Sequence, residues 1–186
     1  MKEEILKASI ALFEEQGFTE TSIQEITDRL DVTKGTFYYY FTSKEQVLMT
    51  IHSRYIDHLL KEQKHIMNCP ASSRKKLERL VHMLISNIAP QGRSARVFFR
   101  EIRHLSDKHL EEVRPKRDQI RLGMKQVIVE GIKAGEFRKD LEADIVTLGI
   151  LGSCNWTYQW FHPDGEKSDI EIAQIYVNMI LEGINT

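Results

Sequence analysis

Hydroxyl, amine and phenol groups are concentrated between Thr33 and Lys44, in the stretch Thr-Lys-Gly-Thr-Phe-Tyr-Tyr-Tyr-Phe-Thr-Ser-Lys. The Lys34 ammonium can donate to guanine O6 or N7, and the Thr36 hydroxyl can bond a phosphate or touch a thymine methyl. Gly35 has no side chain, so its backbone can approach another molecule closely. Side chains of these kinds on one short segment indicate hydrogen bonding to DNA.

Three consecutive tyrosines, Tyr38, Tyr39 and Tyr40, occupy the middle of this stretch. Three consecutive helical residues sweep most of a turn, so at least one phenol must point outward, where it can reach a phosphate. Phe37 and Phe41 are four residues apart and therefore share one helix face, which we expect to be buried. Two further polar residues, Ser43 and Lys44, then start the next helix, whose N-terminus is a ready site for an anion.

The elements that must position these groups are three short helices. The pattern predicts a first helix over about 3–16, which Gly17 ends. A second helix follows Thr21 and Ser22, and the hydroxyl of either residue fits a capping box, with Gln24 or Glu25 three residues later. Asp31 starts a turn before a third helix over about 33–40. Two short helices around a tight turn are typical of a helix-turn-helix, whose second helix enters the major groove of DNA.

The rest of the chain has helical periodicity and no convincing strand alternation. We therefore expect an all-α protein of about nine helices. We expect breaks at Pro90 and Pro163, and a kink or a restart near Pro115, because proline removes a backbone donor. The six later helices are expected at about 44–69, 73–88, 94–105, 108–134, 143–161 and 168–186.

Composition and charge narrow the class of protein. A chain of 186 residues with 41% hydrophobic and 28% charged side chains can bury a core and is not disordered. The two cysteines match no metal or disulfide spacing, and no apolar run is long enough to span a bilayer, so we expect a cytoplasmic protein without a membrane. Residues 1–50 carry five basic and nine acidic side chains, net −4. Any DNA contact must therefore be local, and strong non-specific binding is not expected.

Residues 5 to 48 resemble the TetR/AcrR family of transcriptional regulators. The matching pieces are Gly17-Phe18, then Thr21 to Ile26, then Gly35 to Phe41 leading into Ser43-Lys44-Glu45. The resemblance implies a helix-turn-helix DNA-binding domain over 1–47 and a larger helical effector-binding and dimerisation domain over 48–186. It also implies a homodimer on a palindromic, double-stranded DNA operator, usually a repressor that a small molecule releases.

The family pattern assigns roles to single positions. By position, Gln24, Lys34, Gly35 and Tyr39 are candidate base contacts, and Ser22, Thr36, Tyr38, Tyr40 and Lys44 are candidate phosphate contacts; Thr33 and Ser43 complete the predicted DNA-binding set. For Gln24 a solvated helix residue is an equal alternative. Thr27 stands where alanine is usual, and Asp31 where glycine or asparagine is usual; aspartate tolerates the left-handed turn, so the motif survives.

An arginine stripe marks the expected sixth helix, because Arg93, Arg96, Arg100 and Arg103 are spaced by three or four residues. One interpretation is a solvated basic face that pairs with Glu101, Glu111 and Glu112. The other is a site for a polyanion, for instance the phosphates of a coenzyme A thioester, at the mouth of an apolar pocket.

The segment around Cys154 carries aromatic and small side chains. We interpret Asn155, Trp156 and Trp160, together with Arg96, Arg100 and Arg103, as candidate effector contacts, with core or interface packing as the alternative for the tryptophans. Small residues at a spacing of three to four allow close helix approach, which favours a dimer seam. The residues predicted for that seam are Leu148, Leu151, Gly152, Ile172, Ile175, Tyr176, Met179 and Ile180.

Three other functions compete with the ligand-released repressor. An enzyme is disfavoured because the chain has no phosphate-cradling glycine motif, no zinc-protease helix and no nucleophile elbow. His58 and His65 could share a helix face, but we expect neither a metal nor a cofactor. A helical protein-interaction module that does not bind DNA would explain the excess of acidic over basic side chains in residues 1–50. A transcriptional activator of the same fold would have the same motifs.

Overall fold

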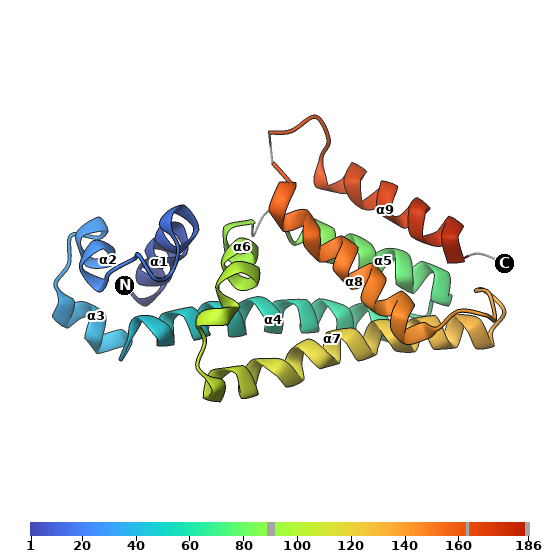
Figure 1. Ribbon diagram of the computed structural model, residues 1–186, viewed down its shortest axis with the longest axis horizontal. Coiled ribbons are helices and arrows are strands. Elements are labelled where there is room, and N and C mark those ends of the chain that lie inside the picture. Colours follow the sequence, from blue (N-terminus) through green and yellow to red (C-terminus); the bar gives the residue numbers. More distant parts are fainter. Residues whose placement is uncertain (89–91, 163, 185–186) are drawn as a thin grey trace. The chain divides into compact units, whose positions relative to one another are not determined.

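The structure, a computed structural model, describes residues 1–88, 92–162 and 164–184, and these residues form α-helices joined by short turns (Figure 1). The expected all-α class is confirmed, since the described residues contain nine α-helices and no strand. The breaks expected at Pro90 and Pro163 lie outside the described residues. The elements are α1 (Lys2–Gln16), α2 (Ile23–Arg29), α3 (Lys34–Tyr40), α4 (Lys44–Asn68), α5 (Ser73–Ser86), α6 (Gly92–Glu101), the 3₁₀ turn η1 (Ile102–His104), α7 (Asp107–Lys133), α8 (Ala143–Trp160) and α9 (Asp169–Ile184).

The chain forms two compact units. The first comprises Met1–Ile56 with Arg93–Arg114, and the second comprises Asp57–Gly92 with Pro115–Thr186. The first unit therefore holds α1 to α3, the start of α4, α6 and the start of α7. The boundary predicted at residue 47 stays a prediction, but α6 clearly groups with the N-terminal helices. The helix α7 runs through Pro115 without the expected restart.

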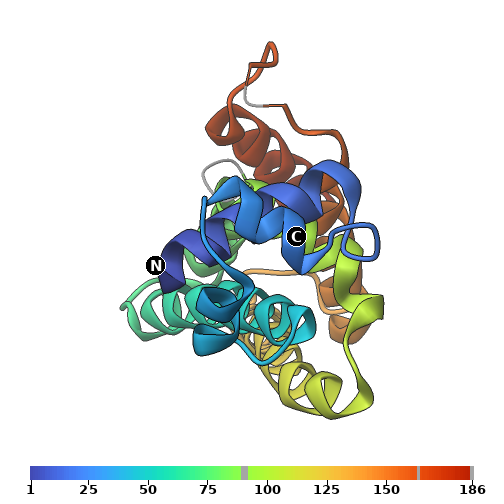
Figure 2. The same cartoon turned by 90° about the vertical axis from the view of Figure 1, so that its left-hand side faces the viewer.

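The core of the first unit is built from apolar faces of α1 to α4. Ile5, Phe13, Ile26 and Phe37 are fully buried, and Val97 of α6 belongs to the same cluster. This burial explains why two helices of only seven residues are stable, because such short helices are marginal without tertiary packing. Figure 2 shows these N-terminal helices from a second direction.

Local capping sets the two ends of the helix-turn-helix. The Ser22 hydroxyl accepts from the Glu25 amide at 3.2 Å, and the Glu25 carboxylate accepts from the Ser22 amide at 2.7 Å, so the expected capping box is present. These bonds, and one from Gln16, lower the pKa of Glu25 to about 2. Asp31 has φ 52°, the left-handed turn expected of it. Thr27 is fully buried, and its hydroxyl donates to the Gln24 carbonyl at 2.8 Å.

The second unit packs α5 against α8 and α9. After α7 the chain reverses, and the amides of Glu136 and Phe137 both donate to the Gly131 carbonyl, at 2.9 and 3.2 Å. This reversal drives the fully buried Phe137 ring against Gly131. A Cβ atom on Gly131 would lie 2.3 Å from that ring, which is far inside van der Waals contact.

We predict that Gly131→Ala destabilises the protein by about 1–3 kcal/mol, because a rigid buried ring cannot move aside in a packed core. Urea unfolding followed by circular dichroism would measure the change. Gly35→Ala is the matched control, since its added Cβ meets nothing nearer than the Thr33 hydroxyl at 3.5 Å. Equal urea midpoints for Gly131→Ala and the unsubstituted protein would contradict this account of the turn.

Candidate nucleic-acid interface and effector residues

The helix α3 divides its aromatic side chains between core and surface. Phe37 and Phe41 are 0% and 2% exposed, so their predicted burial is confirmed, whereas Tyr38 and Tyr39 are 53% and 82% exposed. Tyr40 is partly buried and packs edge-on against Tyr39, with ring centroids 4.8 Å apart. The two phenylalanines therefore determine which way the helix faces and leave two phenols in solvent.

The first turn of α3 presents polar groups beside these phenols. Lys34 and Gly35 are exposed, and Thr36 is partly exposed. Thr33 caps the helix, because its hydroxyl oxygen accepts from the Thr36 amide at 3.2 Å, and the two threonine hydroxyl oxygens are also 3.2 Å apart. A capping hydroxyl that accepts from the backbone keeps its own hydrogen to donate outward. This turn can therefore offer an ammonium, hydroxyls and open backbone to one ligand.

Other predicted contacts lie on α2 and at the start of α4. Ser22 and Gln24 are exposed, and the Gln24 amide donates to Asp28 at 2.6 Å, which orients it along its own helix. The Ser43 hydroxyl accepts from the Gln46 amide at 3.1 Å. Ser22 and Ser43 are thus both caps whose hydroxyl hydrogens remain available to an acceptor.

Lys44 differs from the other predicted contacts because its ammonium is bound inside the chain. It donates to the carbonyl oxygens of Phe18, Thr19 and Thr21, and it lies 4.4 Å from the centroid of the Phe18 ring. Loss of solvent lowers the pKa of this amine. An ammonium has three hydrogens, and here three carbonyls accept them.

The net negative charge of residues 1–50 is largely offset by basic side chains that come later in the sequence and belong to the same unit. Glu3 pairs with Arg54 at 2.6 Å, and Glu14 pairs with Arg96 of α6 at 2.8 Å. Glu45 accepts from the Ser106 amide at 2.9 Å, where α7 begins, and this bond helps to lower its pKa. The first unit as a whole carries 12 basic and 13 acidic side chains, a net charge of −1.

Two arginines of the stripe form ion pairs with a glutamate of α1. Arg96 binds Glu14 through Nε at 2.9 Å as well as through its terminal nitrogen, and Arg93 lies 3.7 Å from the same carboxylate. Arg103 donates to the His104 ring at 3.2 Å, and Arg100 is exposed. Among the described residues, the ion pairs of this stripe are with Glu14, and none is with Glu101, Glu111 or Glu112.

The predicted seam residues on α8 and α9 separate into two groups. Leu148, Ile175 and Met179 are 53%, 48% and 55% exposed, as expected of a surface that could receive a partner. Ile172 and Ile180 are only 7% and 8% exposed, so they lie on the inner face of α9, and their place in the dimer seam stays a prediction. Leu151 and Tyr176 are partly buried, and Gly152 is exposed.

Other apolar side chains of α8 and α9, which the sequence pattern did not predict, are exposed as well. Ile145 is 67% exposed on α8, and Ile170 is 64% exposed on α9. Trp156 and Trp160, taken as effector contacts, are 59% and 42% exposed, whereas Asn155 is partly buried. A count of helix positions from Leu148 would have found Ile145, because residues three apart share a face.

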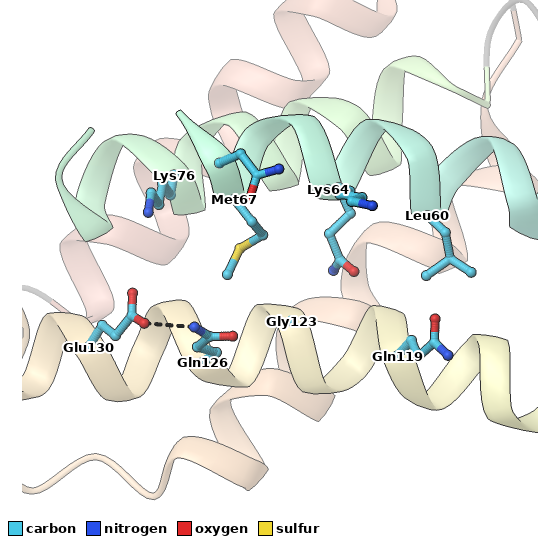
Figure 3. A pocket seen from close by; sticks show the side chains of 10 residues that line it. Leu60, Lys64, Met67, Lys76, Gln119, Gly123, Gln126 and Glu130 are labelled. Carbon is cyan, nitrogen blue, oxygen red and sulfur yellow. Dashed lines mark hydrogen bonds between the residues drawn. The ribbon is translucent and has the colours of Figure 1, made fainter. Parts of the chain in front are cut away.

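Described residues of the second unit line a groove and two smaller cavities. A groove of about 860 Å³ runs along α4 and α5, and His58 there lies 2.9 Å from Asn87. A second cavity, of about 430 Å³, lies between α4 and α7 and is drawn in Figure 3, where Gln126 donates to Glu130 at 2.8 Å. Trp160 lines a third, of about 340 Å³. Among the described residues, no three His, Cys, Asp or Glu side chains are grouped so as to hold a metal ion.

A buried three-helix core that presents one polar, aromatic helix to solvent defines a helix-turn-helix protein. Comparison with known families agrees. The family described as "Bacterial regulatory proteins, tetR family" matches residues 5–50, and "Tetracyclin repressor-like, C-terminal domain" matches residues 70–184. The chain belongs to the TetR family of transcriptional regulators.

Individual relatives are distant in sequence and near in fold. The transcriptional repressor KstR2 of Mycolicibacterium smegmatis is 26% identical over 98% of this chain and 90% of its own length. The structure of the ketosteroid regulator KstR2 of Mycobacterium tuberculosis has a TM-score of 0.93 at 24% identity, covering 100% of this chain and 95% of that one. AibR, solved with isovaleryl coenzyme A and operator DNA, has a TM-score of 0.87 at 22% identity, covering 96% of each chain.

These comparisons confirm the predicted family and fold. The relatives are transcriptional regulators. Within the described residues, no helix has the length and apolar character to cross a membrane.

We predict that Gly35→Ala lowers operator affinity by about tenfold while leaving the melting temperature unchanged or higher. The added methyl has room within the chain, and alanine favours helix more than glycine does. It nevertheless projects from the exposed first turn, where it would hold the backbone away from DNA. Fluorescence anisotropy and differential scanning calorimetry on the same samples would measure both quantities. A lower melting temperature with unchanged operator affinity would show that Gly35 supports the fold and does not contact DNA.

Proposed function

We propose that this chain is a homodimeric repressor that binds a palindromic operator and is released by a small acyl-type effector. The observation that carries the proposal is the outward face of α3. Lys34, Gly35 and Tyr39 lie on that face, and the burial of Phe37 and Phe41 keeps the helix in that orientation. A recognition helix needs an exposed face that can contact DNA, and it needs rigid packing against the rest of its domain.

The exposed groups divide into candidate contacts to DNA bases and candidate contacts to phosphates. Lys34 and Gly35 begin α3, the part of a recognition helix that meets base edges. Around them lie hydroxyls and phenols that suit phosphate oxygens. We assign base contacts to Gln24, Lys34, Gly35 and Tyr39, and phosphate contacts to Ser22, Thr33, Thr36, Tyr38, Tyr40 and Ser43.

We assign dimerisation to the exposed apolar face of α8 and α9. Leu148 and Trp156 on α8, and Ile175 and Met179 on α9, are large apolar side chains that the single chain leaves exposed. A Cβ atom on Gly152 would meet nothing within 4 Å, so a second backbone can approach there. A two-fold dimer would present its two α3 helices to half-sites about 34–36 Å apart, one turn of DNA.

The proposed effector is an acyl-coenzyme A, with a fatty acid as the alternative lipid-like anion. AibR, whose fold this chain shares, was solved with isovaleryl coenzyme A, and Arg93, Arg96, Arg100 and Arg103 supply the charge that coenzyme A phosphates need. Arg96 is bound to Glu14, so an effector phosphate must compete with that carboxylate. Such competition would release α1 from α6, which links effector binding to the DNA-binding helices.

The test of the function is fluorescence anisotropy with short duplexes tiled over the DNA that flanks the gene, at two salt concentrations. We expect tight binding to one palindromic tile, weakened by salt. Lys34→Ala should reduce the preference for this tile over a scrambled duplex by about tenfold, because a good base contact contributes about 1–3 kcal/mol of discrimination.

Two results would count against this proposal. Absence of binding to every tile at both salts would favour a helical interaction module that does not bind DNA. A sedimentation mass of one chain at the concentrations that bind DNA would exclude the homodimer.

We predict that the double substitution Arg96→Ala with Arg100→Ala raises the acyl-coenzyme A concentration needed for half-release of DNA by about tenfold or more. The reason is the loss of two charge-assisted phosphate contacts. Glu14→Gln should have the opposite effect, since it frees Arg96 from its competing carboxylate. Lys139→Ala, at an exposed position between α7 and α8, is the control for a general loss of charge. An unchanged release curve for the double variant would make the stripe a solvated face.

A further inference from the structure

Lys44 lies beside the proposed DNA surface, yet its ammonium is directed into the chain. It donates to the carbonyl oxygens of Phe18, Thr19 and Thr21, the last of which is a buried residue. All three acceptors lie in the loop that joins α1 to α2. The contacts span 23 to 26 residues of sequence, so this one side chain ties the start of α4 to a distant loop.

The loop that Lys44 holds is ordered from its other side as well. Phe18 packs edge-on against Phe13, with centroids 5.2 Å apart, and stacks on His104 at 5.5 Å. The Thr21 hydroxyl donates to the Gly17 carbonyl at 2.8 Å. These contacts fix the side chains of the loop, whereas Lys44 supplies the donors for its carbonyl groups. The contacts to the Phe18 and Thr21 carbonyls are partly buried, and carbonyl groups withdrawn from water need such partners.

The position of this loop determines where α2 begins. Thr21 is followed directly by Ser22, which caps α2 and is a proposed phosphate contact. Gln16 reinforces the same junction, because its amide donates to Glu25 at 3.0 Å, the other half of the capping box. A shift of the Thr21 carbonyl therefore moves Ser22 and the first turn of α2 together.

We propose that Lys44 is a positioning residue for operator binding, which acts through the α1–α2 loop on Ser22 and not by contact with a phosphate. This inference rests on the proposed function. An ammonium whose three hydrogens are all engaged must break a bond to a carbonyl before it can donate to a phosphate. The side chain thus organises the surface and is not part of it.

The salt dependence of binding separates the two roles. A lysine that neutralises a phosphate contributes about 0.9 to the slope of log K against log salt, or about 1.8 for a dimer. We expect Lys44→Met to lower operator affinity by about tenfold between 50 and 200 mM salt while leaving that slope unchanged. A slope reduced by about two would show a phosphate contact and overturn the proposal.

Arginine at the same position supplies a matched control. Lys44→Arg keeps the charge and would preserve a phosphate contact, but its planar guanidinium cannot direct three donors at three converging carbonyls. We therefore expect Lys44→Arg to bind about as weakly as Lys44→Met. Recovery of wild-type affinity by arginine would contradict the positioning role.

A double-mutant cycle tests the path through Ser22. If Lys44 acts by placing Ser22, then adding Ser22→Ala to Lys44→Met should cost less than Ser22→Ala alone, because the contact is already impaired. Strictly additive losses would reject this path.

Calorimetry first establishes that each variant is folded at the assay temperature. If a variant unfolds, amide exchange of residues 18–25 in wild-type protein gives the answer, since the proposal predicts protection there before DNA is added.

The proposed function and this inference fail in different ways. Wild-type protein that binds no DNA would remove the function and leave the carbonyl contacts of Lys44 as a structural feature only. Wild-type protein that binds the operator with a salt-dependent affinity, while Lys44→Met shows the reduced slope, would keep the function and reject the inference.

Discussion

Burial of Phe37 and Phe41 is the constraint on which the DNA-binding surface depends. The helix α3 has only seven residues and little stability of its own, so these two rings hold it against α1, α2 and α4. Once both rings are inside, helical geometry leaves Tyr38 and Tyr39 in solvent beside Lys34 and Gly35. The reading face is thus a consequence of core packing, because two buried rings decide which residues of α3 remain in solvent.

Ion pairs and hydrogen bonds across long sequence separations join α6 and the start of α7 to the N-terminal helices. Glu14 binds Arg96, 82 residues away, and Glu45 binds the Ser106 amide, 61 residues away. Each pair is modest in energy where it is exposed. Together they place the arginine stripe within the same compact unit as the helix-turn-helix. An anion that competes for Arg96 would therefore act directly on α1.

Two lysines of the motif have opposite environments, although both are candidate DNA ligands by sequence. Lys34 is exposed at the start of α3, whereas Lys44 donates to three backbone carbonyls and has a lowered pKa because it is withdrawn from water. One suits contact with DNA, and the other suits support of the loop before Ser22. The same residue type thus serves recognition at one position and preorganisation at the other.

Local sequence by itself determined the helices, the capping box at Ser22, the left-handed turn at Asp31 and the burial of Phe37 and Phe41, because these depend on periodicity and neighbouring residues. It did not reveal the partners of Glu14 and Lys44 or the inward face of Ile172 and Ile180. Only the tertiary structure decided those. Contacts between distant segments depend on how the helices pack, and the sequence of a helix with apolar residues on several faces does not indicate which face lies against the core.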